Sequence, residues 1–173
     1  MILVTLGTHE QPFERALDML APITGPETVL VQHGHTPPRP GTPGVEWVEF
    51  VGREEMRDLV RKASAVVTHA GVGCIVTAIS LRHTPVVIAR LARYGEHVDD
   101  HQVQITTELE TAGMVVACLD GGGLPQAIEK ARSHKASLPG RGDIRRAIAE
   151  ATAVAPRRFF PSIRSVVGAG RTN

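Results

Sequence analysis

Short apolar runs alternate with amphipathic segments along most of the sequence, and this alternation limits the possible folds more than any other feature. The run MILVTL, at residues 1–6, ends at Gly7 and is typical of a buried strand in a parallel sheet. Apolar residues then recur at helical spacing, beginning with Phe13, and Pro12 suits the first position of a helix. The same succession of strand, loop and helix continues to about residue 135.

This pattern predicts an α/β domain of Rossmann-like type, with a parallel sheet covered by helices on both faces. Right-handed crossovers bring the carboxyl ends of all the strands to one edge, where ligands of such sheets bind. The predicted strands are residues 1–6, 27–34, 45–51, 64–69, 84–90 and 114–119. The predicted helices are residues 12–23, 53–63, 73–83, 101–113 and 124–135.

The length of the chain, 173 residues, allows one domain with a hydrophobic core and is too short for two domains of ordinary size. We expect this domain to span residues 1–138, and residues 139–173 to form a helix and a basic tail that packs on the domain or on a partner. Residues 1–128 carry 9 basic and 15 acidic side chains, whereas residues 129–173 carry 10 basic and 3 acidic ones. A basic end of this kind can meet nucleic acid, anionic lipid or an acidic partner, and it can equally be a solvated helix face.

The composition, 42% hydrophobic and 21% charged, is that of a globular protein. No run approaches the ~20 apolar residues that cross a bilayer, and the N-terminal sequence lacks a basic leader and a cleavage site, so we expect a cytoplasmic protein. Cys74 and Cys118 are expected to be reduced, buried thiols, because a domain of this size needs no bridge.

Three loops at the predicted ligand edge carry candidate site residues. GTHEQPF, at residues 7–13, combines a glycine turn with backbone N–H groups near the positive end of the next helix. In VTHAGVGCIVTAIS, Gly71 and Gly73 lie where a strand turns into a helix, and glycine there lets a diphosphate approach backbone N–H groups. RLARYGEHVDDHQ, at residues 90–102, is dense in polar side chains, which at a ligand edge are more often functional than elsewhere.

Each loop also has a purely structural interpretation. The first loop is compatible with a simple turn, and His69 in the second can serve the chemistry or only the packing. In the third, Asp99 or Asp100 could cap the following helix through its free N–H groups. Gln102, by contrast, offers both a donor and an acceptor for sugar hydroxyls.

Other functions lack their motifs. A dinucleotide fingerprint requires a third glycine where Val76 stands, and the next strand ends in Arg90 rather than in an acidic residue that could hold a ribose. His97 and His101 are four residues apart, but there is no HExxH arrangement and no cysteine set, so no metal site is expected. The sequence also has no GxSxG elbow and no P-loop.

The segments GTHEQPF, VVTHAGVGCIVTAI, TPVVIAR and YGEHVDDHQ, in this order and spacing, resemble the C-terminal, donor-binding half of family 28 glycosyltransferases over about residues 1–135. The likeness is greatest to the small stand-alone versions, the Alg13-type subunits and the PssE/EpsE-type exopolysaccharide proteins. The resemblance implies the C-terminal half of a GT-B fold, in which two Rossmann-like domains face each other across a cleft and the other half holds the acceptor.

The resemblance also implies a function. The chain would be the donor-binding, catalytic subunit that moves a hexose from a UDP-sugar to a lipid-linked or polysaccharide-precursor acceptor, without a cofactor. It would act at the membrane through a membrane-anchored partner of Alg14 or PssD type, and no nucleic acid is expected among its partners. The alternatives are a non-catalytic nucleotide-sugar-binding scaffold or regulator of a polysaccharide assembly complex and, more remotely, a nicotinamide oxidoreductase.

The site residues implied by the resemblance fall into a catalytic and a substrate-binding group. In the second group, Gly7 and Thr8 would border the diphosphate. Phe50 and Val51 would hold the uracil. The catalytic residues are His101, Gln102 and Glu96. The substrate-binding residues are Gly7, Thr8, His9, Phe50, Val51, His69, Ala70, Gly71, Val72, Gly73, Thr77, Arg90, His97 and Asp100.

One position departs from the family pattern. Many members carry an acidic residue on the helix after the glycines, where it holds the ribose hydroxyls, and the matching residue here is Thr77. A threonine hydroxyl can make one such contact but not a bidentate one. This departure agrees better with the exopolysaccharide group, and it keeps the scaffold alternative open.

Overall fold

All the strands predicted from the sequence are present and lie parallel in one sheet. The computed structural model describes residues 1–21, 23, 25–119, 123–134 and 149. Its strands are β1 (Ile2–Thr5), β2 (Val29–Gln32), β3 (Val45–Val48), β4 (Ala65–His69), β5 (Val86–Ile88) and β6 (Val116–Ala117). Its helices are α1 (Glu14–Leu20), α2 (Arg53–Lys62), α3 (Val72–Ser80), α4 (His101–Thr111) and α5 (Leu124–Ser133), with a short 3-10 helix, η1 (Ala92–Tyr94), before α4.

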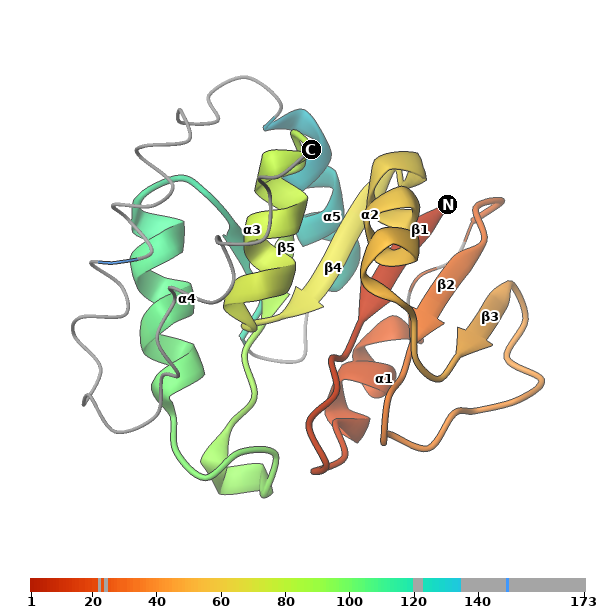
Figure 1. Cartoon of the computed structure of the whole chain (residues 1–173), viewed down its shortest axis with the longest axis horizontal. Helices are drawn as coiled ribbons and strands as arrows, with labels where there is room; N and C mark the ends of the chain where they lie inside the picture. The colour runs from red at the N-terminus through yellow and green to blue at the C-terminus, as the bar shows by residue number, and fades with distance from the viewer. Residues whose placement is uncertain (22, 24, 120–122, 135–148, 150–173) are drawn as a thin grey trace, which may run out of the picture.

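The order of the strands, β3-β2-β1-β4-β5-β6, reverses direction at the centre of the sheet. The chain runs outward from β1 to β3, crosses back to β4, and then runs outward to β6 (Figure 1). In register, Ile2 of β1 lies between Val29 of β2 and Ala65 of β4. Loops leave β1 and β4 toward opposite faces, so the carboxyl ends of these two strands form the topological switch point at which open α/β sheets bind ligands.

Helices cover both faces of the sheet. Helices α1 and α5 pack on one face, with a core that includes Val4, Leu17 and Ile128. Helices α2, α3 and α4 cover the other face (Figure 1). Successive residues of a strand point to opposite faces, and accordingly Leu3 packs toward α2 and α3 while Val4 packs toward α1. This double burial explains why the strands are continuous apolar runs.

The predicted fold class is therefore confirmed, as one α/β unit with a parallel sheet covered on both faces. Several element ends were predicted wrongly: α1 begins at Glu14 and leaves Pro12 outside the helix, and α1, β3 and α3 each end before the predicted residue, at Leu20, Val48 and Ser80. The amide of Phe13 donates to the hydroxyl of Thr36 at 3.1 Å, which holds Phe13 outside the helix as its N-terminal cap.

Some expectations fall only partly on the described residues. The predicted segment 139–173 lies outside them except for Ala149, so the domain boundary at residue 138 stays a prediction.

No helix in the described part of the chain is long and apolar enough to cross a bilayer. The two cysteines are thiols rather than a disulfide; Cys118 is buried, as expected, whereas Cys74 is only half-buried.

We predict that Leu3→Ala lowers the free energy of unfolding by about 2 to 5 kcal/mol, because Leu3 is fully buried beneath α2 and α3 and its truncation leaves a cavity. Urea unfolding followed by circular dichroism measures the change. Val98→Ala is the control, since this side chain is 68% exposed and its loss should cost little. A loss below about 1 kcal/mol for Leu3→Ala would contradict the packing described here.

Candidate functional site

Most candidate site residues lie on the loops and helix starts that follow β1, β3, β4 and β5, at the carboxyl edge of the sheet, while His69 ends β4 and Thr77 lies one turn into α3. Figure 1 shows these loops and helix starts along one edge of the sheet. The turn after β1 is fixed by Gln32, which the sequence analysis did not select. Gly7 has a φ of +80°; its N–H donates to Gln32 Oε1 at 3.2 Å, and its carbonyl accepts from Gln32 Nε2 at 3.0 Å. The Thr5 hydroxyl donates to the same Gln32 oxygen at 2.7 Å. A glutamine at the end of an otherwise apolar strand was the only sequence signal for this role.

The His69 ring packs between the two glycine turns of the switch point. A Cβ added to Gly7 would lie 2.5 Å from His69 Nε2, and one added to Gly71 would lie 2.2 Å from His69 Cε1. Both positions therefore need glycine to accommodate the imidazole. Gly73 differs from them, because a Cβ there would meet nothing within 4 Å. Of the two glycines on which the sequence analysis based a phosphate site, Gly73 borders open space and Gly71 borders His69.

The His69 imidazole is neutral at neutral pH. Burial lowers its pKa to about 4, and the positive charge of Arg90 and the nearby His9 and His97 act in the same direction. Its Nδ1 atom is buried and has no hydrogen-bond partner among the described residues, while Nε2 lies 3.9 Å from the thiol of Cys74. A neutral ring in this place supports the two turns without adding charge to the site.

The start of α3 is suited to an anion. Gly71 caps this helix without a side-chain hydrogen bond, and the first turn, all of it described, contains no acidic residue. The positive end of the helix macrodipole is thus left without a local countercharge. Thr77, on the next turn, donates its hydroxyl proton to the Gly73 carbonyl at 2.8 Å, so only the lone pairs of its oxygen remain for another group.

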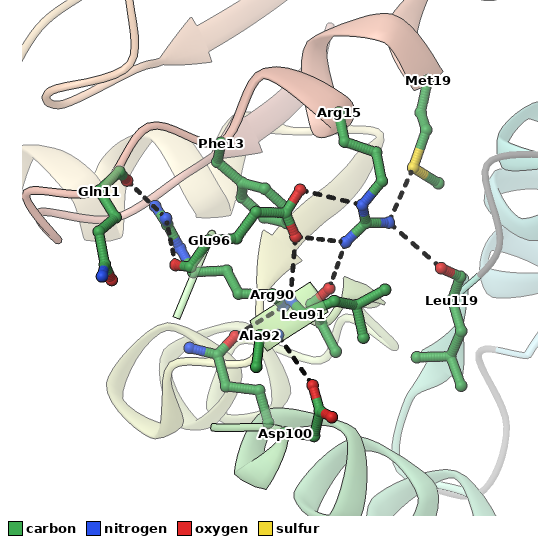
Figure 2. A network of polar contacts seen from close by, with 12 residues as sticks. Gln11, Phe13, Arg15, Met19, Arg90, Leu91, Ala92, Glu96, Asp100 and Leu119 are labelled. Atoms are coloured by element: carbon green, nitrogen blue, oxygen red, sulfur yellow. Dashed lines mark hydrogen bonds and ion pairs between the residues drawn. The ribbon is translucent and has the colours of Figure 1, made fainter. Parts of the chain in front are cut away.

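Arg15 and Glu96 form a buried ion pair that the sequence analysis did not predict. Arg15 Nε donates to Glu96 Oε1 at 3.0 Å, and its second terminal nitrogen donates to Glu96 Oε2 at 2.9 Å (Figure 2). The same guanidinium reaches the carbonyls of Ala89, at 2.6 Å, and Leu119, at 3.2 Å. Glu96 Oε2 also accepts the Leu91 N–H at 2.9 Å. The pair joins α1 to the loops after β5 and β6.

Arg90 ties the third loop to the first. It is 1% exposed, and its guanidinium donates to the carbonyls of Gln11 and Glu96 at 2.6 and 3.2 Å (Figure 2). It also donates to the carbonyl of Leu6 at 3.1 Å. The ring of Phe13 lies 4.6 Å below it, close enough for a cation–π contact. Burial lowers the pKa of Arg90 to about 10, which leaves it charged at neutral pH. Its predicted contact with substrate stays a prediction.

The start of α4 is held by side chains of the same loop. The N-cap residue Asp100 makes no capping hydrogen bond with its side chain, but Asp99 Oδ1 accepts the His101 N–H at 3.1 Å and so satisfies one free N–H group of the helix start. Asp100 instead accepts the Ala92 N–H at 2.8 Å. Gln102 Oε1 accepts the Arg90 N–H at 3.0 Å, so this amide oxygen is already engaged within the protein. Its NH₂ group is the part that can meet a sugar hydroxyl or a phosphate.

The remaining predicted residues are placed as follows. His9 and His97 bring the first and third loops together, with ring centroids 5.3 Å apart. Burial, followed by the charge of Arg90, lowers the pKa of His9. Phe50 is 46% exposed and follows β3, farther out along the edge. The centroid of its ring lies 5.3 Å from that of the His35 ring. Thr8 is exposed, Val51 and Val72 are half-buried, and Ala70 is buried.

Two cavities, of 260 and 490 Å³, lie at the opposite edge of the sheet, near the starts of the strands. Ile2 lines the first and Ala65 the second, and Arg132 borders both. Neither cavity touches the loops that hold His69 or Glu96.

A family model described as "Glycosyltransferase family 28 C-terminal domain" matches residues 1–153, which is most of the chain. The chain belongs to this family. The family model does not distinguish the Alg13-like and PssE/EpsE-like groups within it. No curated protein matches the chain.

Solved glycosyltransferase structures share the fold of this family 28 domain. The calicheamicin glycosyltransferase CalG4 aligns with a TM-score of 0.54 at 16% identity, over 87% of this chain and 38% of its own. SnogD from Streptomyces nogalater aligns at 21% identity over 87% of this chain and 43% of its own, with a TM-score of 0.44. By the alignment with CalG4, the sheet and its helices correspond to the C-terminal half of a GT-B fold. The chain spans less than half the length of CalG4 and of SnogD.

We predict that Gly7→Ala destabilises the family 28 domain by about 1 to 3 kcal/mol more than Gly41→Ala does. Both glycines have a left-handed φ, +80° and +84°, but only the new Cβ at position 7 would collide with the His69 ring. Urea unfolding gives the loss of stability in each variant. Because both variants carry the backbone strain of a left-handed alanine, the difference between them measures the collision with His69. When His69→Ala is also present, the difference in destabilisation between Gly7→Ala and Gly41→Ala should become smaller. If the two variants destabilise the otherwise wild-type chain equally, the contact between Gly7 and the His69 ring is wrong.

We also predict a pH dependence that originates at His69. The unfolded pKa is 6.5 and the folded pKa about 4, so the neutral ring favours the fold fully above pH 6.5, and this contribution is lost as the pH falls toward 4. Between about pH 7.5 and pH 4.5 the wild type should lose about 2 to 3 kcal/mol more than His69→Gln loses. Urea unfolding at a series of pH values gives both curves. Parallel curves would show that His69 does not titrate in this way.

Proposed function

We propose that this chain is the donor-binding, catalytic subunit of a two-component glycosyltransferase. It transfers a hexose from a UDP-sugar to a lipid-linked or polysaccharide-precursor acceptor, together with a membrane-anchored subunit of Alg14 or PssD type. The observation that carries the proposal is the meeting of the Gly7 turn and the α3 start at the switch point of a family 28 C-terminal domain.

The diphosphate of the donor lies between the turn after β1 and the first turn of α3 in this proposal. Gly73 leaves the approach to the helix open, and the helix start has no acidic residue to repel an anion. Arg90 is buried next to this position and remains charged, so it adds a positive potential without contacting solvent. Backbone N–H groups and a helix dipole at such a turn are a well-suited phosphate site.

The nucleobase lies toward β3. Phe50 follows β3, which is two strands from β1, so it is roughly 10 Å from the Gly7 turn along the edge of the sheet. Its exposed ring offers a face on which a base can lie, and the neighbouring backbone groups of Val51 offer hydrogen bonds. Thr77 supplies one hydroxyl oxygen to the ribose in place of the carboxylate of other family members.

The reaction is a displacement at the anomeric carbon of the donor sugar. The bond from this carbon to the UDP oxygen breaks, the bond to the acceptor oxygen forms, and the acceptor proton passes to a base that the partner supplies. The departing UDP gains negative charge, which the α3 start, His101 and the NH₂ group of Gln102 stabilise. These groups need no metal ion or cofactor.

In this proposal the partner subunit completes the site. The chain covers about two fifths of the length of CalG4 and SnogD, and the loops at its carboxyl edge carry the exposed side chains of Phe50, Tyr94 and Val98. A second wall across this edge would exclude water and orient the acceptor. The partner keeps the complex at the cytoplasmic surface of the membrane.

We predict that UDP and one UDP-hexose raise the melting temperature of the chain, and that the chain and its partner together transfer that hexose. Gln102→Ala and His101→Ala should lower transfer about tenfold to a thousandfold, because in this proposal each removes a group that stabilises the leaving UDP. Gln104→Ala, an exposed glutamine on the same helix, is the matched control and should leave the rate unchanged. A thermal-shift panel of UDP, UDP-glucose, UDP-galactose and UDP-N-acetylglucosamine selects the donor.

Other results would point to the alternatives. Nucleotide binding without transfer from any UDP-hexose, combined with loss of polysaccharide assembly when the chain is deleted, would favour the scaffold. A rise in melting temperature with NADPH but not with UDP would favour an oxidoreductase and contradict the proposal.

A further inference from the structure

We propose that Glu96 is a positioning residue, and that its buried ion pair with Arg15 sets the place of the loop between β5 and α4 against the turn after β1. This inference deepens the proposed function and rests on it, because the loop and the α4 start carry the residues that would meet the donor. It gives Arg15 a role in the site. It also makes Glu96 a residue that positions other groups, rather than one that takes part in the reaction itself.

The Glu96 carboxylate is not available to a substrate. The residue is 3% exposed, and Arg15 engages both carboxylate oxygens in a two-pronged contact. The second oxygen also accepts the Leu91 N–H. A general base must come within hydrogen-bond distance of the proton that it takes, and a carboxylate enclosed by protein donors has no free approach. Glu96 therefore acts on the donor through the loop that it holds.

Arg15 connects three parts of the fold that are distant in sequence. It lies on α1, its side chain is 16% exposed, and it bonds the carbonyl of Ala89 at the end of β5 and that of Leu119 after β6. Lysine could not replace these contacts, because one ammonium lacks the planar fork that grips a carboxylate at two points. Arg15 thus fixes the loop after β5 relative to α1, through the contacts drawn in Figure 2.

The loop passes this restraint to α4. The Arg90 N–H is bonded to Gln102 and the Ala92 N–H to Asp100, so the first residues of the loop and the first residues of α4 move together. The Glu96 carbonyl also accepts from the Arg90 guanidinium, which in turn bonds Leu6 and Gln11 beside the Gly7 turn. Loss of the ion pair leaves one buried charge unpaired and loosens both connections.

Hydrogen exchange of three amides tests the proposal. The Leu91 amide bonds Glu96 directly, whereas the amides of Arg90 and Ala92 bond Gln102 and Asp100. Glu96→Gln keeps the size of the side chain and an acceptor for Leu91 but removes the charge. We expect all three amides to exchange about tenfold faster or more in Glu96→Gln and in Arg15→Met. Asp18→Asn, which breaks an exposed ion pair on the same helix, is the control and should leave them unchanged.

The double variant Arg15→Met with Glu96→Gln gives a second test, which remains informative if Arg15→Met alone fails to fold. The double variant should exchange its amides no faster than the more affected single variant, and it should transfer sugar with the partner subunit no more slowly. The reason is that the two residues act as one unit. The proposal would be overturned if Glu96→Gln lost transfer while its amides exchanged at the wild-type rate, and Arg15→Met transferred normally. Glu96 would then be a catalytic residue.

Failure of this inference can be told apart from failure of the proposed function. If the wild type neither binds UDP nor transfers sugar, the proposed function fails, while the exchange of the three amides still decides whether the ion pair holds the loop. If the wild type transfers sugar and the Arg90 and Ala92 amides of both single variants remain protected, the proposed function stands and the positioning role is wrong.

Discussion

Burial of the parallel sheet on both faces leaves few places for polar side chains, and this constraint concentrates them at the ends of the strands. Thr5, Gln32, Arg90 and Glu96 are each at most 3% exposed, and all of them lie at the carboxyl edge or on its loops. Buried polar groups require partners, so these side chains bond one another and the neighbouring backbone. The loops at this edge are consequently ordered by hydrogen bonds as well as by the packing of apolar residues such as Phe13.

The electrostatic character of the edge follows from the same constraint. Arg90 is buried there and Arg15 is half-buried. Arg15 forms an ion pair with Glu96, whereas Arg90 donates to carbonyl oxygens and feels the charge of Glu96 without an ion pair. Among these three described side chains, two positive charges and one negative charge leave one net positive charge beside the switch point. Burial, and after it the charge of Arg90, lowers the pKa values of both His69 and His9. A positive field from a fixed, inaccessible source attracts an anion without binding it too tightly at a single point.

The fold could be predicted from the sequence because its signals are local. Apolar runs, helical spacing and glycines located the strands, the helices and their order, and Phe13, Ala16, Leu17 and Leu20 are all buried as their spacing indicated. The site was predicted only in outline. Gln32 and Arg15 were missed because their partners, Gly7 and Glu96, are 25 and 81 residues away along the chain. Glu96 was recognised as part of a polar loop, but its enclosure by protein donors depends on contacts with α1 that no local pattern reveals.

The packing of His69 has a consequence for how this region can vary among relatives. Gly71 has an ordinary backbone conformation, with φ −70° and ψ 118°, which any amino acid can adopt, so only the imidazole keeps this position small. Residues 69 and 71 should therefore change together: a relative with a smaller side chain at position 69 is free to carry alanine or serine at position 71. Position 7 is less permissive, because its left-handed φ favours glycine whatever stands at position 69.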